Sequence, residues 1–239
     1  MQHLLRAAPE LLSACERVAL KSGPWPVSDG QDDDSLYFPE TGLLALSLPA
    51  PGTRSWTPRS ARLALLGCHG VWSPRQALTS DFLAEVLVPG DAMRVAESVV
   101  RSVDVPLAKW WMQVAASKQH LIHQMARMAL CAHKHSPAQT LASCLLMAQF
   151  NSAARPLPMP MVALRDWLGW PPDAWQSAWD ALDSQGAVVQ VGQGATANIQ
   201  IQALDTLTGL ACACHPMVGL DGADKGSRDR CTSHNGPAQ

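Results

Sequence analysis

The chain has 239 residues, of which 47% are hydrophobic and 16% charged, and its 18 basic and 20 acidic side chains leave a net charge of -2. A chain of this length can bury a core without disulfide bonds, and the charge balance argues against a strongly basic nucleic-acid binder and a disordered polyelectrolyte. No apolar run approaches the roughly 20 residues of a membrane span, and the first residues lack the order of a signal peptide. We therefore expect a soluble, cytoplasmic protein with no membrane contact.

The small net charge hides a segregation of charge along the chain. Residues 1–105 carry 9 basic and 12 acidic groups, residues 106–156 carry 5 basic groups and no acidic one, and residues 157–215 carry 1 basic and 5 acidic groups. Such shifts are typical of segments with different roles.

The first third of the sequence predicts a short helix followed by a small β domain. The apolar spacing in residues 2–20 indicates the helix, and residues 23–34 are rich in Pro, Gly, Ser and Asp, which predicts a loop. Short apolar runs at 43–48, 63–66 and 82–88 then alternate with Pro and Gly. Short strands separated by frequent turn residues favour a sandwich or barrel.

A helix of about 28 residues is predicted over residues 106–134, because apolar side chains recur there at helical spacing. One possible partner for its apolar stripe is the β domain itself. We favour a second copy of the same helix, which would form a two-stranded homodimer seam, because one small barrel cannot cover so long a helix. The residues expected in the seam are Trp110, Trp111, Val114, Leu121, Met125 and Met128.

The next part of the chain predicts a winged helix-turn-helix. Helices are expected over 137–149, 160–168 and 173–185, with Pro171 and Pro172 between the last two and Gly186 as a stop signal. Two short strands follow, around 188–191 and 199–201. This order of helices followed by a small hairpin is that of a winged helix-turn-helix.

With these elements in place, the chain resembles the Crp/Fnr family of transcriptional regulators. Several segments in the family's order carry the resemblance: 36–42, 64–71, 88–94, Cys131 with His135, Leu141 with Leu145 and Leu146, Leu164, Leu168 with Gly169, Leu182 with Gly186 and Val188, and Leu207 with 211–215. The resemblance implies an α+β chain with an N-terminal cyclic-nucleotide-binding-like β-roll (jelly-roll-like, 1–105), a dimerisation helix (106–136) and a C-terminal winged helix-turn-helix (137–215). Residues 216–239 are expected to be a disordered tail.

The sequence departs from the family at the positions that would meet DNA. Where the family usually carries arginines, before the recognition helix, this chain has Pro171 and Pro172, and residues 173–185 contain no Lys or Arg. Lys and Arg supply most of the affinity for phosphates. The remaining candidates for DNA contact are Arg165, Gln176 and Ser177, since Gln can read adenine.

Tryptophans crowd the same region. Trp170, Trp175 and Trp179 either form part of a bulky core or present an aromatic surface to a protein partner, since Trp is enriched in binding hot spots. The second alternative would make the chain an interaction module. The partner could be another protein with a basic surface, or the chain's own basic segment around the long helix, with the winged domain folded back onto it.

The candidate effector site of the β-roll is also atypical. Family members that bind cyclic nucleotides use a Gly-Glu pair and an arginine, whereas this chain offers residues 67–70, which read Gly-Cys-His-Gly, and Arg75. We therefore expect His69 and Arg75 to line a degenerate pocket, with no cofactor and no cyclic nucleotide bound. The roll is then either a scaffold or the sensor of a ligand that is not a cyclic nucleotide.

Metal binding and catalysis find little support in the sequence. The seven cysteines are scattered, Cys212 and Cys214 form a single Cys-x-Cys that is too little for a site alone, and His120, His123, His133 and His135 are expected on a solvated helix face. No Gly-rich phosphate loop, zinc-protease motif or nucleophile elbow is present. We therefore expect no metal, no catalytic residue and no enzyme activity.

The sequence as a whole predicts an atypical Crp/Fnr-like transcriptional regulator with a weak or lost DNA-binding surface. The alternative is a protein-interaction module on the same fold that does not bind DNA and acts through its Trp-rich acidic winged domain.

Overall fold

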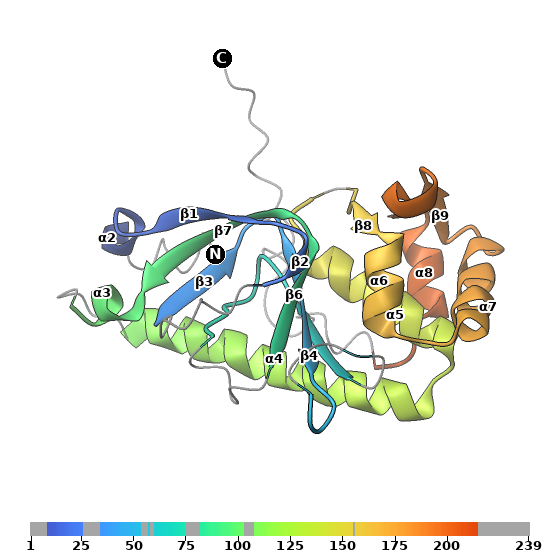
Figure 1. Cartoon of the computed structure of the whole chain (residues 1–239), viewed down its shortest axis with the longest axis horizontal. Helices are drawn as coiled ribbons and strands as arrows, with labels where there is room; N and C mark the ends of the chain where they lie inside the picture. The colour runs from blue at the N-terminus through green and yellow to red at the C-terminus, as the bar shows by residue number, and fades with distance from the viewer. Residues whose placement is uncertain are drawn as a thin grey trace, which may run out of the picture.

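The computed structural model describes residues 9–25, 34–53, 57, 60–74, 82–102, 108–154 and 156–214. In Figure 1 a β domain and a smaller helical domain lie at the two ends of the molecule, and the long helix α4 runs along one side of both. No helix within the described ranges combines the length and the apolar character that a bilayer crossing needs. The predicted tail at 216–239 lies outside the described residues.

The N-terminal domain is a β-roll built from two antiparallel sheets with strand orders β1-β7-β3 and β2-β6-β4-β5. Its elements are α2 (Pro9–Leu12), β1 (Glu16–Leu20), β2 (Gly23–Pro24), β3 (Ser35–Pro39), β4 (Leu43–Leu48), β5 (Ala61–Leu66), β6 (Leu83–Val88), β7 (Gly90–Ala96) and α3 (Glu97–Ser102). The predicted strands at 43–48, 63–66 and 82–88 are confirmed. The predicted helix over 2–20 is wrong at 16–20, which pair with residues 90–94 of β7, because a distant strand satisfies this backbone better than a local helix does.

The inside of the roll is filled by aromatic and aliphatic side chains. Trp25 packs edge-on against Tyr37, with ring centroids 5.2 Å apart, and Trp72 joins the same buried cluster. Leu121 and Met125 of α4 cover the cluster from outside the sheets. The residues that the structure describes thus place a buried aromatic and aliphatic cluster inside the roll.

Two helices, α4 (Ala108–Lys134) and α5 (Pro137–Asn151), connect the roll to the C-terminal domain. Ser136 caps α5: its side chain accepts a hydrogen bond from the Gln139 backbone N–H, and the Gln139 side chain accepts one from the Ser136 N–H. This capping box satisfies two donors that the helix start would otherwise leave free. All of residues 140–148 are buried, so α5 lies inside the molecule.

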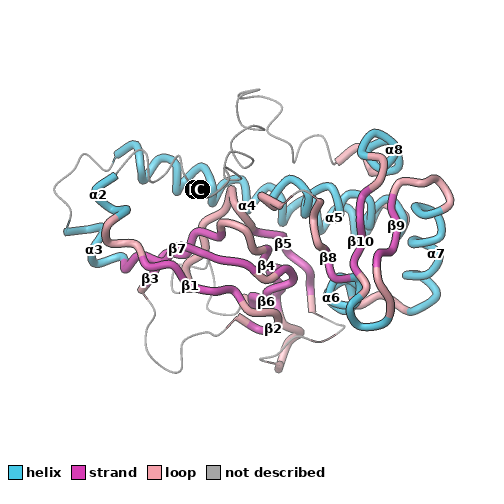
Figure 2. The backbone as a smooth tube through the Cα atoms, turned by 90° about the horizontal axis from the view of Figure 1, so that it is seen from above, coloured by secondary structure: helices cyan, strands magenta, loops and turns pink. Residues whose placement is uncertain are grey.

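The C-terminal domain has the predicted order of helices and a small hairpin (Figure 2). Its elements are β8 (Met159–Pro160), α6 (Met161–Leu168), α7 (Pro172–Asp183), β9 (Val188–Val191), the 3₁₀ turn Gly194–Thr196, β10 (Asn198–Ile201) and α8 (Leu204–Leu210). Gly169 has φ +57° and ends α6 in the left-handed region, which lets the chain turn into α7. The sequence did not predict β8, which pairs with β10 in the third sheet, or α8.

One continuous core joins the winged domain to the roll. It contains Leu43, Leu65 and Leu87 from the roll together with α5 and Trp167. The buried Trp167 indole Nε1–H donates to Ser47 Oγ at 3.0 Å, and Arg62 Nε donates to the Trp167 carbonyl at 3.1 Å. These contacts fix the position of the winged domain on the roll.

Candidate functional site

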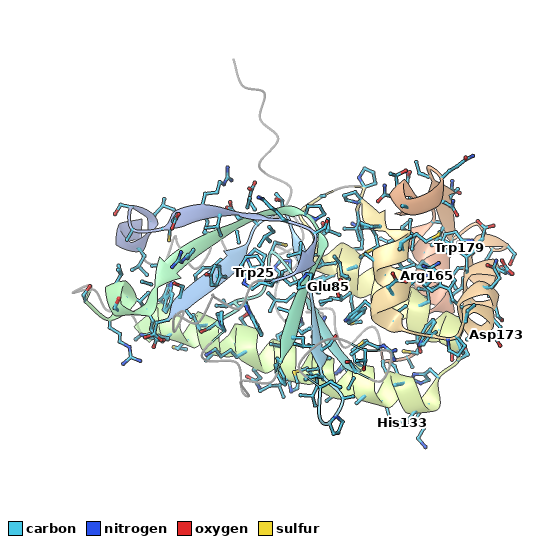
Figure 3. All side chains as sticks on the ribbon, viewed as in Figure 1. Trp25, Glu85, His133, Arg165, Asp173 and Trp179 are labelled. Atoms are coloured by element: carbon cyan, nitrogen blue, oxygen red, sulfur yellow. The ribbon has the colours of Figure 1, made fainter. Side chains whose placement is uncertain are left out.

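The exposed face of α7, the expected recognition helix, is acidic. Asp173, Gln176, Ser177, Asp180 and Asp183 are all solvent-exposed. The Gln176 side-chain amide donates to Asp180 Oδ1 at 2.8 Å. Figure 3 shows Asp173 at the edge of the winged domain, near the start of α7. This face offers two neutral polar groups between carboxylates that would repel a phosphate backbone.

Within the described part of the winged domain, one arginine is the basic side chain. Arg165 on α6 is the one Lys or Arg in the described ranges 137–154 and 156–214, and its guanidinium forms an ion pair of 3.1 Å with the adjacent Asp166. The wing residues 191–196 are exposed and uncharged. The predicted contact residues Arg165, Gln176 and Ser177 are therefore all accessible, but they bring little net positive charge to one surface.

The proposed tryptophan surface is not present. Trp175 and Trp179 are only 6% and 9% exposed and belong to the shared core, and Trp170 is half-buried against it. The prediction of an aromatic partner surface is corrected accordingly: the tryptophans fill the interior of the winged domain, as the core interpretation required. Because Trp175 and Trp179 are four positions apart, they lie on one helix face, and this face points inward.

The apolar stripe that we assigned to a dimer seam packs against the chain's own roll. Trp110 and Val114 are buried in a cluster with Phe38 and Leu36, and Trp111 packs beside them. Leu121 and Met125 cover the roll interior, and Met128 lies in the shared core. The periodicity identified an apolar face correctly but assigned it to the wrong partner.

A second stripe on α4 is exposed. Its spacing alternates between four and three residues, the pattern of coiled-coil core positions, and its members are Ala108, Met112, Ala115, Gln119, Ile122, Ala126, Ala129 and His133. Met112 is 71% exposed and Ile122 is 47% exposed, and six of the eight side chains are apolar. This stripe faces away from the residues first predicted for the seam.

Comparison with solved structures identifies the fold. FixK2 from Bradyrhizobium japonicum matches with 17% identity and a TM-score of 0.58, over 83% of this chain and 98% of that chain. A CRP/FNR-family transcriptional regulator from Thermus thermophilus matches with 18% identity and a TM-score of 0.58, over 82% and 98%. The c-di-GMP responsive global regulator CLP of Xanthomonas campestris matches with 9% identity and a TM-score of 0.53, over 85% and 100%. The chain has the Crp/Fnr fold.

This result confirms the fold predicted from the sequence. The Thermus thermophilus neighbour is named as a transcriptional regulator, and identities below 20% make the likeness one of fold. No protein-family model matches the chain, and no curated protein matches it.

Of the two residues predicted for an effector pocket of the Crp/Fnr roll, only His69 lies among the described residues. Arg75 lies outside the described residues. The His69 ring stacks on Phe150 of α5 with a centroid distance of 4.8 Å, and its carbonyl accepts a hydrogen bond from Ser117 of α4. His69 therefore lies where the roll meets α4 and α5, and its ring is occupied by a protein contact.

His120 belongs to the same contact region. Its ring lies 6.2 Å from that of Phe150. Burial lowers the pKa of His120, and the nearby His69, His123 and Arg127 act in the same direction. The expected solvated helix face is therefore wrong at His120, whereas His123 and His133 are exposed.

A cavity of about 450 Å³ opens beside this junction, between α4, β5 and the winged domain. Arg62, Met125, His133, Thr140 and Trp170 are among its lining residues. Its wall is largely apolar, and it could not be predicted from the sequence because the lining residues come from four separate elements.

Four potential metal ligands meet where α4 ends. Cys131, His135, Cys212 and Cys214 place one ligand atom each within 4.8 Å of one another. Cys131 and Cys212 are buried, whereas His135 and Cys214 are half-buried. In the sequence Cys212 and Cys214 form an isolated pair, because the other two ligands lie about 80 residues earlier.

The thiols of this group titrate differently. Burial, together with the neighbouring Cys212, raises the pKa of Cys131. Burial also acts to raise the pKa of Cys212, but hydrogen bonds with Ser143, Cys131 and Cys214 outweigh it and leave that pKa lowered. The neighbouring groups thus shift the pKa values of Cys131 and Cys212 in opposite directions.

Proposed function

We propose that this protein is a cytoplasmic, homodimeric transcriptional regulator of the Crp/Fnr type with a weak DNA-contact surface and no enzyme activity. The observation that carries the proposal is the exposed α7 and its wing, held on a Crp/Fnr fold by the shared core. The acidic residues on α7 make the DNA contact weak, because nonspecific affinity depends on Lys and Arg.

The roll in this proposal is a scaffold rather than a cyclic-nucleotide receptor. Trp25, Tyr37 and Trp72 fill its interior, and His69 is stacked on Phe150. A ligand in the roll would have to displace buried side chains, and that costs the free energy of their packing.

Mobility-shift titration tests the DNA contact. The full chain is titrated against its own upstream DNA and against unrelated DNA of equal length, at low and at physiological salt. We expect a preference for the upstream DNA with an affinity weaker than the roughly 10⁻⁸ M of strong specific binders and a shallow salt dependence, because few phosphates are neutralised. Nanomolar affinity with a steep salt dependence would contradict the weak surface, and absence of any shift would favour the alternative.

The homodimer in this proposal forms through the exposed stripe of α4. Ile122→Glu places a charge in the middle of the stripe at an exposed position, and it is expected to convert the dimer into a monomer. Light scattering coupled to size exclusion measures the mass, and Ile122→Leu is the matched control that should remain dimeric. A dimer that survives Ile122→Glu would place the interface elsewhere.

The alternative is a protein-interaction module that does not bind DNA, and the acidic face of α7 favours it. In this case the surface would be Asp173, Asp180 and Asp183 rather than the tryptophans. Cross-linking of the intact protein in cells, with the D173N/D180N/D183N variant as control, distinguishes the two functions: loss of a defined protein partner in the variant supports the module.

A further inference from the structure

The geometry points to a zinc-binding site formed by Cys131, His135, Cys212 and Cys214 at the junction between α4 and the end of the winged domain. The site is independent of DNA binding. A bound ion would hold residues 211–214, which follow α8, against the end of α4.

The distances fit a single tetrahedral ion. Zinc bonds of about 2.3 Å to sulfur and about 2.0 Å to nitrogen place neighbouring ligand atoms about 3.5–3.8 Å apart. All four ligand atoms lie within 4.8 Å of one another, and Cys131 Sγ lies 3.4 Å from Cys212 Sγ. Small side-chain rotations are enough to bring the four atoms around one ion.

The space and the polar groups at the site also suit an ion. A cavity of about 10 Å³ is lined by Cys131, Cys212 and Cys214, which is about the lower limit for one water molecule. His135 Nδ1 is buried and has no hydrogen-bond partner among the described residues. An unsatisfied buried nitrogen is costly, and coordination to a metal would satisfy it.

The fold presents the ligands without strain on the backbone. Cys131 and His135 are four residues apart at the end of α4, where the His135 N–H donates to the Cys131 carbonyl, so both side chains lie on one face. Cys212 and Cys214 follow α8 in a short bend and turn, which brings both sulfur atoms close to Cys131 and His135.

Neighbouring groups hold this second segment in place. The Cys212 N–H donates to Ser143 Oγ, whose distance to Cys212 Sγ is 3.2 Å. Arg127 donates to the Cys214 carbonyl at 3.1 Å. Outer groups of this kind orient metal ligands and tune their affinity.

The ligand set selects the metal and the type of site. Three thiolates and one imidazole are a set typical of structural zinc, and all four positions are filled by protein, which leaves no open position for catalysis. A Cys131–Cys212 disulfide is the competing arrangement of the same atoms. The two arrangements differ in metal content and in free thiols.

Metal analysis of the full chain, purified under reducing conditions, tests the site. We expect about one zinc per chain, and after removal of the metal with a chelator, added Co²⁺ should give the thiolate charge-transfer bands of tetrahedral cobalt. Cys131→Ser and Cys212→Ser should abolish stoichiometric zinc. Cys15→Ser, which removes a half-buried thiol outside the cluster, should keep it.

Two milder variants keep the test decisive if the cysteine variants fail to fold. Ser143→Ala retains all four ligands and should weaken zinc binding by about 10–100-fold, whereas His135→Cys supplies a fourth thiolate and should retain the metal. Zinc removal should lower the Tm of the wild type and leave that of Cys131→Ser unchanged.

Three results would overturn the proposal. The first is a reduced, folded wild type that contains no zinc and does not take up added Zn²⁺ or Co²⁺. The second is full zinc content in Cys131→Ser and Cys212→Ser. The third is a Cys131–Cys212 disulfide, detected by peptide mass spectrometry, in protein isolated from cells with thiols trapped at lysis.

Discussion

The inner side of the winged domain, which contacts the roll, and its outer side, formed by the exposed face of α7 and the wing, differ in the range of their hydrogen bonds. On the inner side, the hydrogen bonds of Trp167 to Ser47 and of Arg62 to the Trp167 carbonyl join residues more than 100 positions apart in the sequence. On the outer side, the hydrogen bond from Gln176 to Asp180 stays within one turn of α7, and that from Asn198 to the Thr196 carbonyl stays within the wing.

This difference indicates that the placement of the winged domain on the roll is specified more strongly than the chemistry of its exposed face. Buried hydrogen bonds are costly to leave unmade, whereas substitutions on an exposed face usually change stability little. Function on the outer side can therefore vary while the position of the domain is kept.

Removal of the Trp167 side chain, on the inner side, should lower stability more than any other change proposed for the two sides. Trp167→Ala leaves a cavity in the shared core, and the free energy of unfolding is expected to fall by about 3–5 kcal/mol. Denaturant unfolding measures the change, and Trp170→Ala, at a half-buried position on the same domain, is expected to cost less. An equal loss of unfolding free energy in the two variants would show that the contact of Trp167 with the roll contributes no more stability than a half-buried position does.

Loss of the hydrogen bond alone should have a smaller effect. Ser47→Ala leaves the buried Trp167 N–H without its acceptor, so stability is expected to fall by about 1–3 kcal/mol. Ser177→Ala on the exposed face of α7 is the control and should lie within about 0.5 kcal/mol of the wild type. If Ser47→Ala left the free energy of unfolding unchanged, the inner side would be no more sensitive to substitution than the outer side.

A pair of carboxylates next to the inner contact should make stability depend on pH. Burial, and then the nearby Asp166, raises the pKa of Glu85 above its usual value. The stability that protonated Glu85 provides is present below about pH 4.5 and is lost as the pH rises through the raised folded pKa. Glu85→Gln, which mimics the protonated form, should therefore raise the Tm at pH 7, and this advantage should shrink as the pH falls toward 4.5.

The smallest effect on stability is expected on the outer side. The D173N/D180N/D183N variant should unfold with nearly the wild-type free energy, within about 0.5 kcal/mol per substitution. Its affinity for DNA should nevertheless rise, because repulsion of the phosphates is removed. Mobility shift and denaturant unfolding on the same preparation separate the two effects, and unchanged DNA affinity would show that α7 does not approach the phosphates.

Patterns within a single element predicted the fold well. The helices over 137–149, 160–168 and 173–185 and the strands at 188–191 and 199–201 are confirmed because their signals are local: apolar period, Pro and Gly. Strand β1 was missed because its pairing with β7 depends on residues about 70 positions away.

The candidate sites were harder to predict, because they depend on which elements meet. The spacing on α4 shows that Trp110 and Val114 share an apolar face, but not that this face covers the roll while Met112 and Ile122 face outward. The cluster around Cys131 combines two short motifs that are uninformative one at a time. Only the fold brings Cys212 within 3.4 Å of Cys131.

The burial of residues 140–148 of α5 prevents the winged domain from being separated cleanly from the roll. Residues 140–148 have no exposed member, and they pack in a core to which Leu43 and Leu65 of the roll also belong. A winged domain cut out at residue 137 would carry an uncovered apolar surface and is expected to aggregate. Exchange of this domain with that of a relative would have to bring the matching strands of the roll with it, because the two halves share one core.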